Sequence, residues 1–423
     1  MQGNSLKSFD QTYRRNAMKA KFTRIDIYDP EKDGPQFLSG FIRDKPFERI
    51  HDVVGANILA LEDKNLKAVL IVIDACYLDG HWQDKLRKIL REQGIHSIIS
   101  VTHTHGAPSM VHSPTLGRVD EEYLKQVMTR VLADVRLAFE NMEKVFEIKV
   151  YQEAMMENII MRRTHITDYP NPGYLHKMMS DHTPGIVLRD VGNLNLLEIN
   201  TTHNLPIVMS NLGCHPNVIK GEPQWHQMTR DYPGALSDYI ERYYYSFSLF
   251  TQGASGDIRP AMLKGDFEAL EAFSVTLGAK ATNLLLRDKP FVYSYGKDLK
   301  LRFEEVTLSI PYSQTPDFTV AMSALKIGAS ILITAPGELY SSLARTIEGM
   351  FKNKAIIIGC ANGTIGYIPD EEDFRVNHKN GTPLASWTTV PYFIPGYGNP
   401  GGRPNSDIGE IIVSGARKLL EMA

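Results

Sequence analysis

Several apolar runs in this chain end in the same way, with a histidine, a carboxylate or a tyrosine next to glycine or proline. The segments are SVTHTHGAP with His103 and His105, NLGCHPN with His215, TAPGELY with Glu338 and NGTIGYIPD with Tyr367. Each run has the length and composition of a buried strand. Because these residues lie far apart in sequence, they can meet only if everything between them folds as one body. We therefore expect a single domain over residues 1–423.

The order of the apolar runs predicts an α/β fold. Residues 67–74 and 97–102 have strand patterns, and residues 81–94 between them carry apolar residues at helical spacing. A strand, a helix and a strand of these lengths form a crossover unit, so we expect the two strands to be parallel. The other expected strands lie near 146–152, 192–199, 205–212, 246–252, 324–334 (a hairpin turning at Gly328) and 354–360, and the other expected helices near 119–142, 233–244, 266–287, 338–351 and 406–421.

This mixture of parallel and antiparallel strands predicts a mixed sheet core that is flanked by helices. In α/β sheets, ligands bind beyond the carboxyl ends of the strands. The residues His103, His215, Asp257, Glu338 and Tyr367 all follow predicted strands. If those strands run parallel, we expect the five side chains to gather at one edge of the sheet.

The same side chains are typical of a zinc site. Side chains two residues apart on an extended segment point the same way, so the imidazoles of His103 and His105 are expected to address one point. A histidine pair with a further histidine and a carboxylate supplies the donors that zinc prefers. Glu338 also suits the first turn of the predicted helix, where a carboxylate is stabilising. Asp257, in the turn SGDIRP, either orients a ligand histidine or stabilises its own turn.

Composition narrows the range of partners. The chain has 46 basic and 49 acidic residues and a formal charge of −3, with no basic run that would indicate nucleic acid binding. No apolar stretch reaches the roughly 20 residues that span a bilayer, and the polar N-terminal segment has no secretory signal, so we expect a cytoplasmic protein. Cys76, Cys214 and Cys360 lie far apart in apolar runs, a pattern of buried reduced thiols. The expected partner is a small molecule, and the oligomeric state stays open.

Taken in order, the motifs THTHGAP, GCHPN, SGDIRP, APGELY and GYIPDEEDF resemble the N-terminal catalytic domain of the neutral/alkaline, non-lysosomal ceramidases. The likeness extends from residue 20 to the C-terminus. It implies a single catalytic zinc ion (Zn²⁺) and an acid/base histidine, which corresponds to His105. It also implies a substrate-contacting arginine, which corresponds to Arg162 in IIMRRTH. The implied zinc ligands are His103, His215, Glu338 and Tyr367.

The sequence departs from the ceramidase pattern at three places. Arg259 stands where the family has a serine, residues 375–386 replace a tyrosine-bearing segment, and we expect no counterpart of the family's immunoglobulin-like C-terminal domain. These differences favour a substrate that is smaller and more polar or acidic than a long-chain lipid. Arg162, Arg163 or Arg259 would bind its carboxylate or oxyanion. The long loop 378–405, rich in glycine, proline and aromatic residues, is expected to close over the site.

These patterns predict a zinc-dependent hydrolase that cleaves a linear amide (N-acyl) bond with metal-activated water. His105 would take a proton from the water and pass it to the leaving amine. One alternative is a dinuclear-metal amidohydrolase on a TIM barrel, which requires a bridging lysine or carboxylate and a late strand-end aspartate; neither has a clear candidate. A second alternative is a non-catalytic binding protein derived from a hydrolase, with Arg259 marking the lost activity.

Overall fold

The computed structural model describes residues 17–162, 190–371 and 407–422, except residues 42, 113–116, 157, 263 and 312–317. The predicted loop 378–405 lies outside these residues. Within them, no helix combines the length and the apolar character needed to cross a lipid bilayer. The prediction of one domain over residues 1–423 stays a prediction.

The largest described sheet has nine strands, and eight of them follow one path, with the ninth beside it. In the order of that path the strands are β11 (Phe247–Gln252), β9 (Ile207–Leu212), β8 (Asp190–Thr201), β6 (Glu143–Met156), β1 (Lys19–Asp26), β3 (Gly55–Glu62), β4 (Lys67–Ile73) and β5 (Ile95–Val101), with β13 (Val292–Tyr295) paired to β6. Strands β4 and β5 are parallel, as the crossover pattern predicts, and β8 and β9 form the predicted hairpin.

A second sheet has four strands, and three two-stranded pairs complete the described strands. Its strands are β14 (Leu301–Ile310), β15 (Phe318–Ile327), β16 (Ser330–Thr334) and β18 (Ala355–Ile358). The hairpin between β15 and β16 turns at Gly328, whose φ of 62° suits glycine. The short pairs are β2 (Arg49–Ile50) with β10 (Gln227–Met228), β7 (Ile160–Arg162) with β12 (Ile258–Pro260), and β17 (Glu338–Leu339) with β19 (Tyr367–Ile368); a 3-10 turn, η2 (Gly296–Asp298), follows β13.

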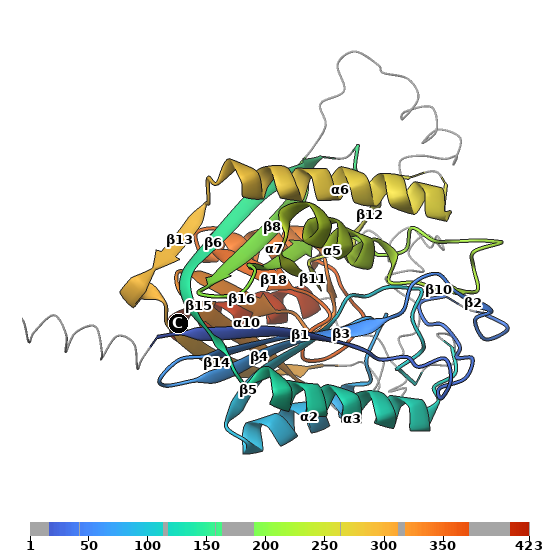
Figure 1. Ribbon diagram of the computed structural model, residues 1–423, viewed down its shortest axis with the longest axis horizontal. Helices are drawn as coiled ribbons and strands as arrows, with labels where there is room; N and C mark the ends of the chain where they lie inside the picture. The colour runs from blue at the N-terminus through green and yellow to red at the C-terminus, as the bar shows by residue number, and fades with distance from the viewer. Residues whose placement is uncertain are drawn as a thin grey trace, which may run out of the picture.

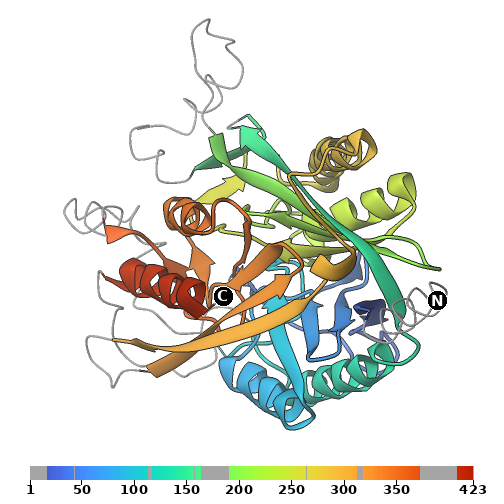
Figure 2. The ribbon, with the colours of Figure 1, turned by 90° about the vertical axis from the view of Figure 1, so that its left-hand side faces the viewer.

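The helices lie in pairs on three sides of the strands (Figures 1 and 2). The pairs are α2 (Gly80–Glu92) with α3 (Glu121–Ala138), α5 (Asp231–Tyr244) with α6 (Phe267–Arg287), and α7 (Ser341–Met350) with α10 (Ile408–Met422). Each pair packs on one part of the sheets through its own apolar cluster. The predicted class, a mixed α/β fold with a sheet core flanked by helices, is therefore confirmed.

Neighbouring residues on the central strands face opposite cores. Ile71, Val208 and Ile333 pack toward the helix pairs, whereas Leu70, Met209 and Leu332, one position away, share a single inner cluster. Side chains alternate across a strand, and strands covered on both faces are apolar throughout. This explains why the sequence shows continuous apolar runs at these strands.

The strand ends that carry the predicted site belong to three parallel pairs, β4–β5, β9–β11 and β16–β18. The expectation of one parallel sheet edge is therefore wrong. Antiparallel strands separate β4–β5 from β9–β11 within the nine-stranded sheet, and β16–β18 belongs to the four-stranded sheet. The chain after β18 joins their ends: Gly359 N–H donates to Gln252 of β11, and Asn362 N–H donates to Ile99 of β5. Antiparallel neighbours such as β8–β9 and β14–β15 also contradict the TIM-barrel alternative.

Candidate metal centre

His103 lies just beyond β5 in a turn of the backbone. Its φ of 64° is left-handed, and its ring stands at 90° to that of His105, with the centroids 5.2 Å apart. The expectation that both histidines continue an extended segment is therefore wrong. Nδ1 of His103 lies 2.7 Å from the backbone carbonyl of Cys76 and donates its proton there. The lone pair of the neutral ring is then on Nε2, which lies 3.4 Å from Oε2 of Glu338.

His215 follows β9 and is oriented in the same manner. Its Nδ1 lies 2.6 Å from the carbonyl of Ser255 and 3.2 Å from that of Ile258, in the turn after β11. Nε2 therefore carries the lone pair, and it lies 2.8 Å from Oε2 of Glu338. The two histidines thus present the same type of nitrogen to one carboxylate oxygen.

Glu338 occupies a short strand and not the first turn of a helix. Strand β17 pairs in parallel with β19, which sets Glu338 opposite Tyr367, and α7 begins only at Ser341. The prediction that a helix starts at residue 338 is therefore wrong. Both side chains of the cross-strand pair reach the histidines: Glu338 directly, and Tyr367 through its hydroxyl, which donates to Nε2 of His215 at 3.2 Å. The hydroxyl of Tyr77 donates to the other carboxylate oxygen, Oε1.

The donor atoms of His103, His215 and Glu338 all lie within 4.8 Å of one another, and the three residues are buried. Nε2 of His103 and Oε2 of Glu338 form no hydrogen bond with any residue that the structure describes. The 2.8 Å contact between His215 and Glu338 also lacks a proton between its atoms, because Nδ1 of His215 carries the ring proton. Unsatisfied buried polar atoms of this kind are costly, and a shared cation satisfies them together. The donor set fits a zinc ion.

The ionisation of Glu338 points to the same need for positive charge. Burial acts to raise the pKa of this carboxyl, but the imidazoles of His103 and His215 hold the pKa well below its usual range. Glu338 is therefore a carboxylate in a dry environment. Protonation of one imidazole would supply one positive charge to pair with this carboxylate. A metal cation would supply positive charge and would also accept the lone pairs of both imidazoles and of the carboxylate.

His105 borders this group and is held on two sides. Its ring centroid lies 5.2 Å from that of His103 and 5.9 Å from that of His215. The ring of Phe41 packs edge-on against it, and its backbone carbonyl accepts a hydrogen bond from Arg43. The guanidinium of Arg43 also stacks over Trp225, and burial lowers its pKa to about 10.

The predicted residues of the SGDIRP turn lie beside His215. The carboxylate of Asp257 accepts hydrogen bonds from the N–H and the hydroxyl of Ser341, both at 2.7 Å, at the start of α7. The carbonyls of Ser255 and Ile258, on either side of Asp257, orient the ring of His215. Asp257 therefore holds the turn against α7.

The two predicted substrate-binding arginines lie on a small ladder next to this turn. Arg259 is half-buried on β12, opposite Met161 of β7, and Arg162 lies opposite Ile258. The backbone of Arg162 is described, whereas its side chain and Arg163 lie outside the described part of the chain. The ladder brings both positions to the segment that orients His215.

Sequence reasoning missed Tyr77, Cys76 and Arg43. The segment DACYLDG follows the predicted strand 67–74 directly, so the strand-end position was the available indication for Cys76 and Tyr77. Arg43 had no such indication, because it lies in an irregular segment before the first predicted strand. Its contact with His105 depends on the tertiary fold.

Two solved structures have the same overall fold. The neutral ceramidase from Pseudomonas aeruginosa matches with a TM-score of 0.68 and 14% sequence identity, over 96% of this chain and 75% of that one. A ceramidase complexed with C2 matches with a TM-score of 0.67 and 14% identity, over 96% of this chain and 76% of that one. No family model matches the sequence, and no curated protein matches it significantly.

Proposed function

From a fold shared with solved ceramidases, we propose that this chain is a zinc-dependent hydrolase that cleaves a linear amide (N-acyl) bond. The observation that carries the proposal is the buried meeting of Nε2 of His103, Nε2 of His215 and Oε2 of Glu338. Neither Nε2 of His103 nor Oε2 of Glu338 forms a hydrogen bond with a described residue. Tyr367 completes the proposed ligand set. The fold likeness supports the class of reaction.

Each residue of the chain has a separate task in this proposal. A zinc ion, when bound, supplies Lewis acidity that polarises a carbonyl group and acidifies water. The carbonyls of Cys76 and Ser255 fix the tautomers of His103 and His215, and Tyr77 fixes the orientation of the Glu338 carboxylate.

His105 is the proposed acid/base group. A ring nitrogen of His105 takes the proton from the attacking water and then delivers it to the nitrogen of the leaving amine. A histidine suits this task because its unperturbed pKa lies near neutral pH. The contacts from Phe41 and Arg43 keep the ring beside the proposed metal ligands.

The substrate is proposed to be a small amide with a carboxylate or another anionic group. Arg259 is half-buried on β12, next to Ile258, whose carbonyl orients His215. A half-buried guanidinium on the segment that orients His215 favours an anion and disfavours an uncharged lipid chain, because such a cation gains most from a carboxylate partner.

The experiment combines metal analysis with hydrolysis of a panel of N-acyl amino acids and ceramides. The zinc-equilibrated wild-type protein is expected to hold one zinc ion per chain and to cleave an anionic member of the panel faster than ceramide. His103→Ala is expected to lose both the metal and the hydrolysis. His96→Ala, which removes a half-buried histidine from β5, the strand that precedes His103, should keep both. Full hydrolysis in a strong chelator, or by the His103→Ala variant, would refute the proposal.

A further inference from the structure

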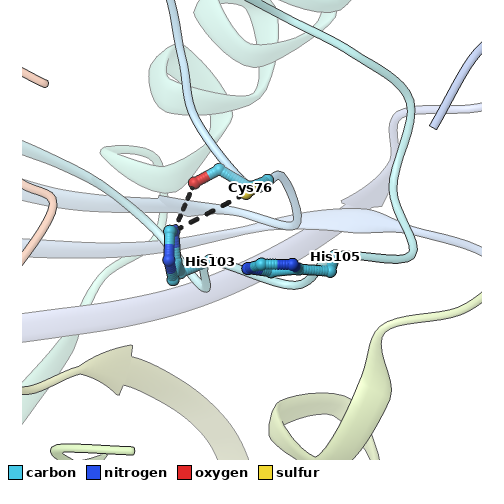
Figure 3. A group of neighbouring side chains, drawn as sticks. All are labelled: Cys76, His103 and His105. Carbon is cyan, nitrogen blue, oxygen red and sulfur yellow. Dashed lines mark hydrogen bonds between the residues drawn. The ribbon is translucent and has the colours of Figure 1, made fainter. Parts of the chain in front are cut away.

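A cysteine lies beside the two histidines of the His-x-His pair. Figure 3 shows Cys76, His103 and His105 together, with Nδ1 of His103 facing both the carbonyl and the sulfur of Cys76. Sγ of Cys76 lies 3.8 Å from that nitrogen. One donor atom from each of the three residues lies within 4.8 Å of the other two, and all three residues are buried.

We propose that Cys76, His103 and His105 form a second metal-binding group, which takes thiophilic divalent cations such as cadmium. One sulfur and two nitrogens are soft and borderline donors, which select such cations over magnesium and calcium. Binding replaces the thiol proton of Cys76 with the cation and releases that proton to solvent. The resulting thiolate, which is costly to bury alone, is then paired with positive charge.

This group and the His103–His215–Glu338 group share His103. The sulfur of Cys76 faces Nδ1 of His103, so a cation binds there only when the ring proton moves from Nδ1 to Nε2. A cation held by Cys76 and His105 therefore leaves a proton on the nitrogen that the other group needs. The two groups are alternative sites, and one cation occupies one of them at a time. The cadmium site goes beyond the proposed hydrolysis and does not depend on it, whereas its competition with zinc rests on the zinc site of the proposed function.

Cadmium titration of the zinc-loaded, full-length protein tests the assignment without an activity assay. Sulfur-to-cadmium charge transfer gives an ultraviolet absorption band, and metal analysis of the filtrate gives the zinc that is released. We expect the band to grow to one cadmium per chain, with one zinc ion released for each cadmium ion bound. Cadmium NMR of the wild-type protein should give a chemical shift typical of mixed sulfur and nitrogen ligation.

The chain offers a matched control for the thiol. Sγ of Cys360 lies 3.9 Å from the same His103 nitrogen, but Cys360 is not part of the proposed group. Cys76→Ser is expected to abolish the band and to keep zinc, whereas Cys360→Ser should keep the band. Glu338→Gln should weaken zinc binding and keep the band, which separates this proposal from the proposed function.

Four results would overturn the proposal. They are a wild-type protein without the band, a band that survives Cys76→Ser, a band that is lost in Cys360→Ser, and cadmium binding that leaves all the zinc in place. If Cys76→Ser does not fold, the cadmium NMR shift of the wild-type protein decides between sulfur and purely nitrogen and oxygen ligation.

Discussion

His103 combines a left-handed backbone with complete burial of its ring. A φ of 64° places it in a region that costs residues other than glycine roughly 1–3 kcal/mol. Its Nε2 also faces a carboxylate without a hydrogen bond from any described residue. Backbone strain and an unsatisfied buried nitrogen at the same residue are expected where the binding of a ligand offsets their cost. A cation between His103 and Glu338 would provide that compensation.

Tyr77 gives a prediction at the residue scale. Removing its hydroxyl with Tyr77→Phe deprives Oε1 of Glu338 of a donor and lets the carboxylate rotate, so zinc affinity should fall about tenfold. Competition with a chromophoric chelator measures the affinity. Tyr123→Phe is the control, because Tyr123 is also buried and packs in the cluster between α3 and the sheet. Equal zinc affinity in both variants would contradict the assigned role of Tyr77.

The proposed metal ligands could be predicted from sequence, and the residues that orient them could not. His103, His215, Glu338 and Tyr367 follow apolar runs, and strand ends are where α/β proteins bind ligands. Tyr77 meets Glu338 across 261 residues of sequence, and Arg43 meets the carbonyl of His105 through an irregular segment. Hydrogen bonds of this kind depend on tertiary geometry that no local pattern encodes.

At the scale of elements, glycine allows the strand ends to approach closely. A Cβ atom on Gly256 would lie 2.3 Å from the backbone oxygen of Glu338, and one on Gly359 would lie 2.5 Å from that of Gly253. Backbone atoms cannot move aside to accommodate an added Cβ atom as the end of a flexible side chain can. The turn after β11 can therefore pack against β17 only because residue 256 has no side chain.

Gly256→Ala should for this reason damage both stability and metal binding. Overpacking costs about 1–3 kcal/mol or more, and the backbone shift would move Glu338 away from the histidines. Gly349→Ala is the matched control: this glycine lies in α7 with no atom within 4 Å of an added Cβ, so alanine should stabilise the helix by roughly 0.5–1 kcal/mol. Urea unfolding and zinc titration measure both effects. Intact zinc binding in a stable Gly256→Ala protein would contradict the argument.

The strands that sequence reasoning missed have sequence patterns that do not distinguish a strand from other secondary structure. Strand β1, KAKFTRID, intersperses its apolar residues with charged ones, and only Ala20 is fully buried. Strand β3, GANILALE, contains alanine, leucine and glutamate, which also favour helices. Parallel pairing with β19 holds Glu338 in a strand. Local sequence cannot show such pairing partners.

At the scale of the whole molecule, the arrangement of the strand pairs explains how distant residues meet. Each parallel pair carries its own helices outside and contributes to one shared inner cluster. The alternation of helices and strands predicted the α/β class. It could not predict that the chain after β18 would join the ends of β5 and β11, because those contacts are backbone hydrogen bonds across layers. Ceramidase structures with 14% identity share the overall fold.

X-ray diffraction above and below the zinc absorption edge, on crystals of the zinc-equilibrated protein, tests most directly whether the converging residues hold a cation. The predicted result is one anomalous peak at about 2.0–2.2 Å from Nε2 of His103, Nε2 of His215 and a carboxylate oxygen of Glu338. A zinc-saturated crystal with no peak among these three residues, or with its zinc bound elsewhere, would contradict the metal centre and the hydrolase proposed from it.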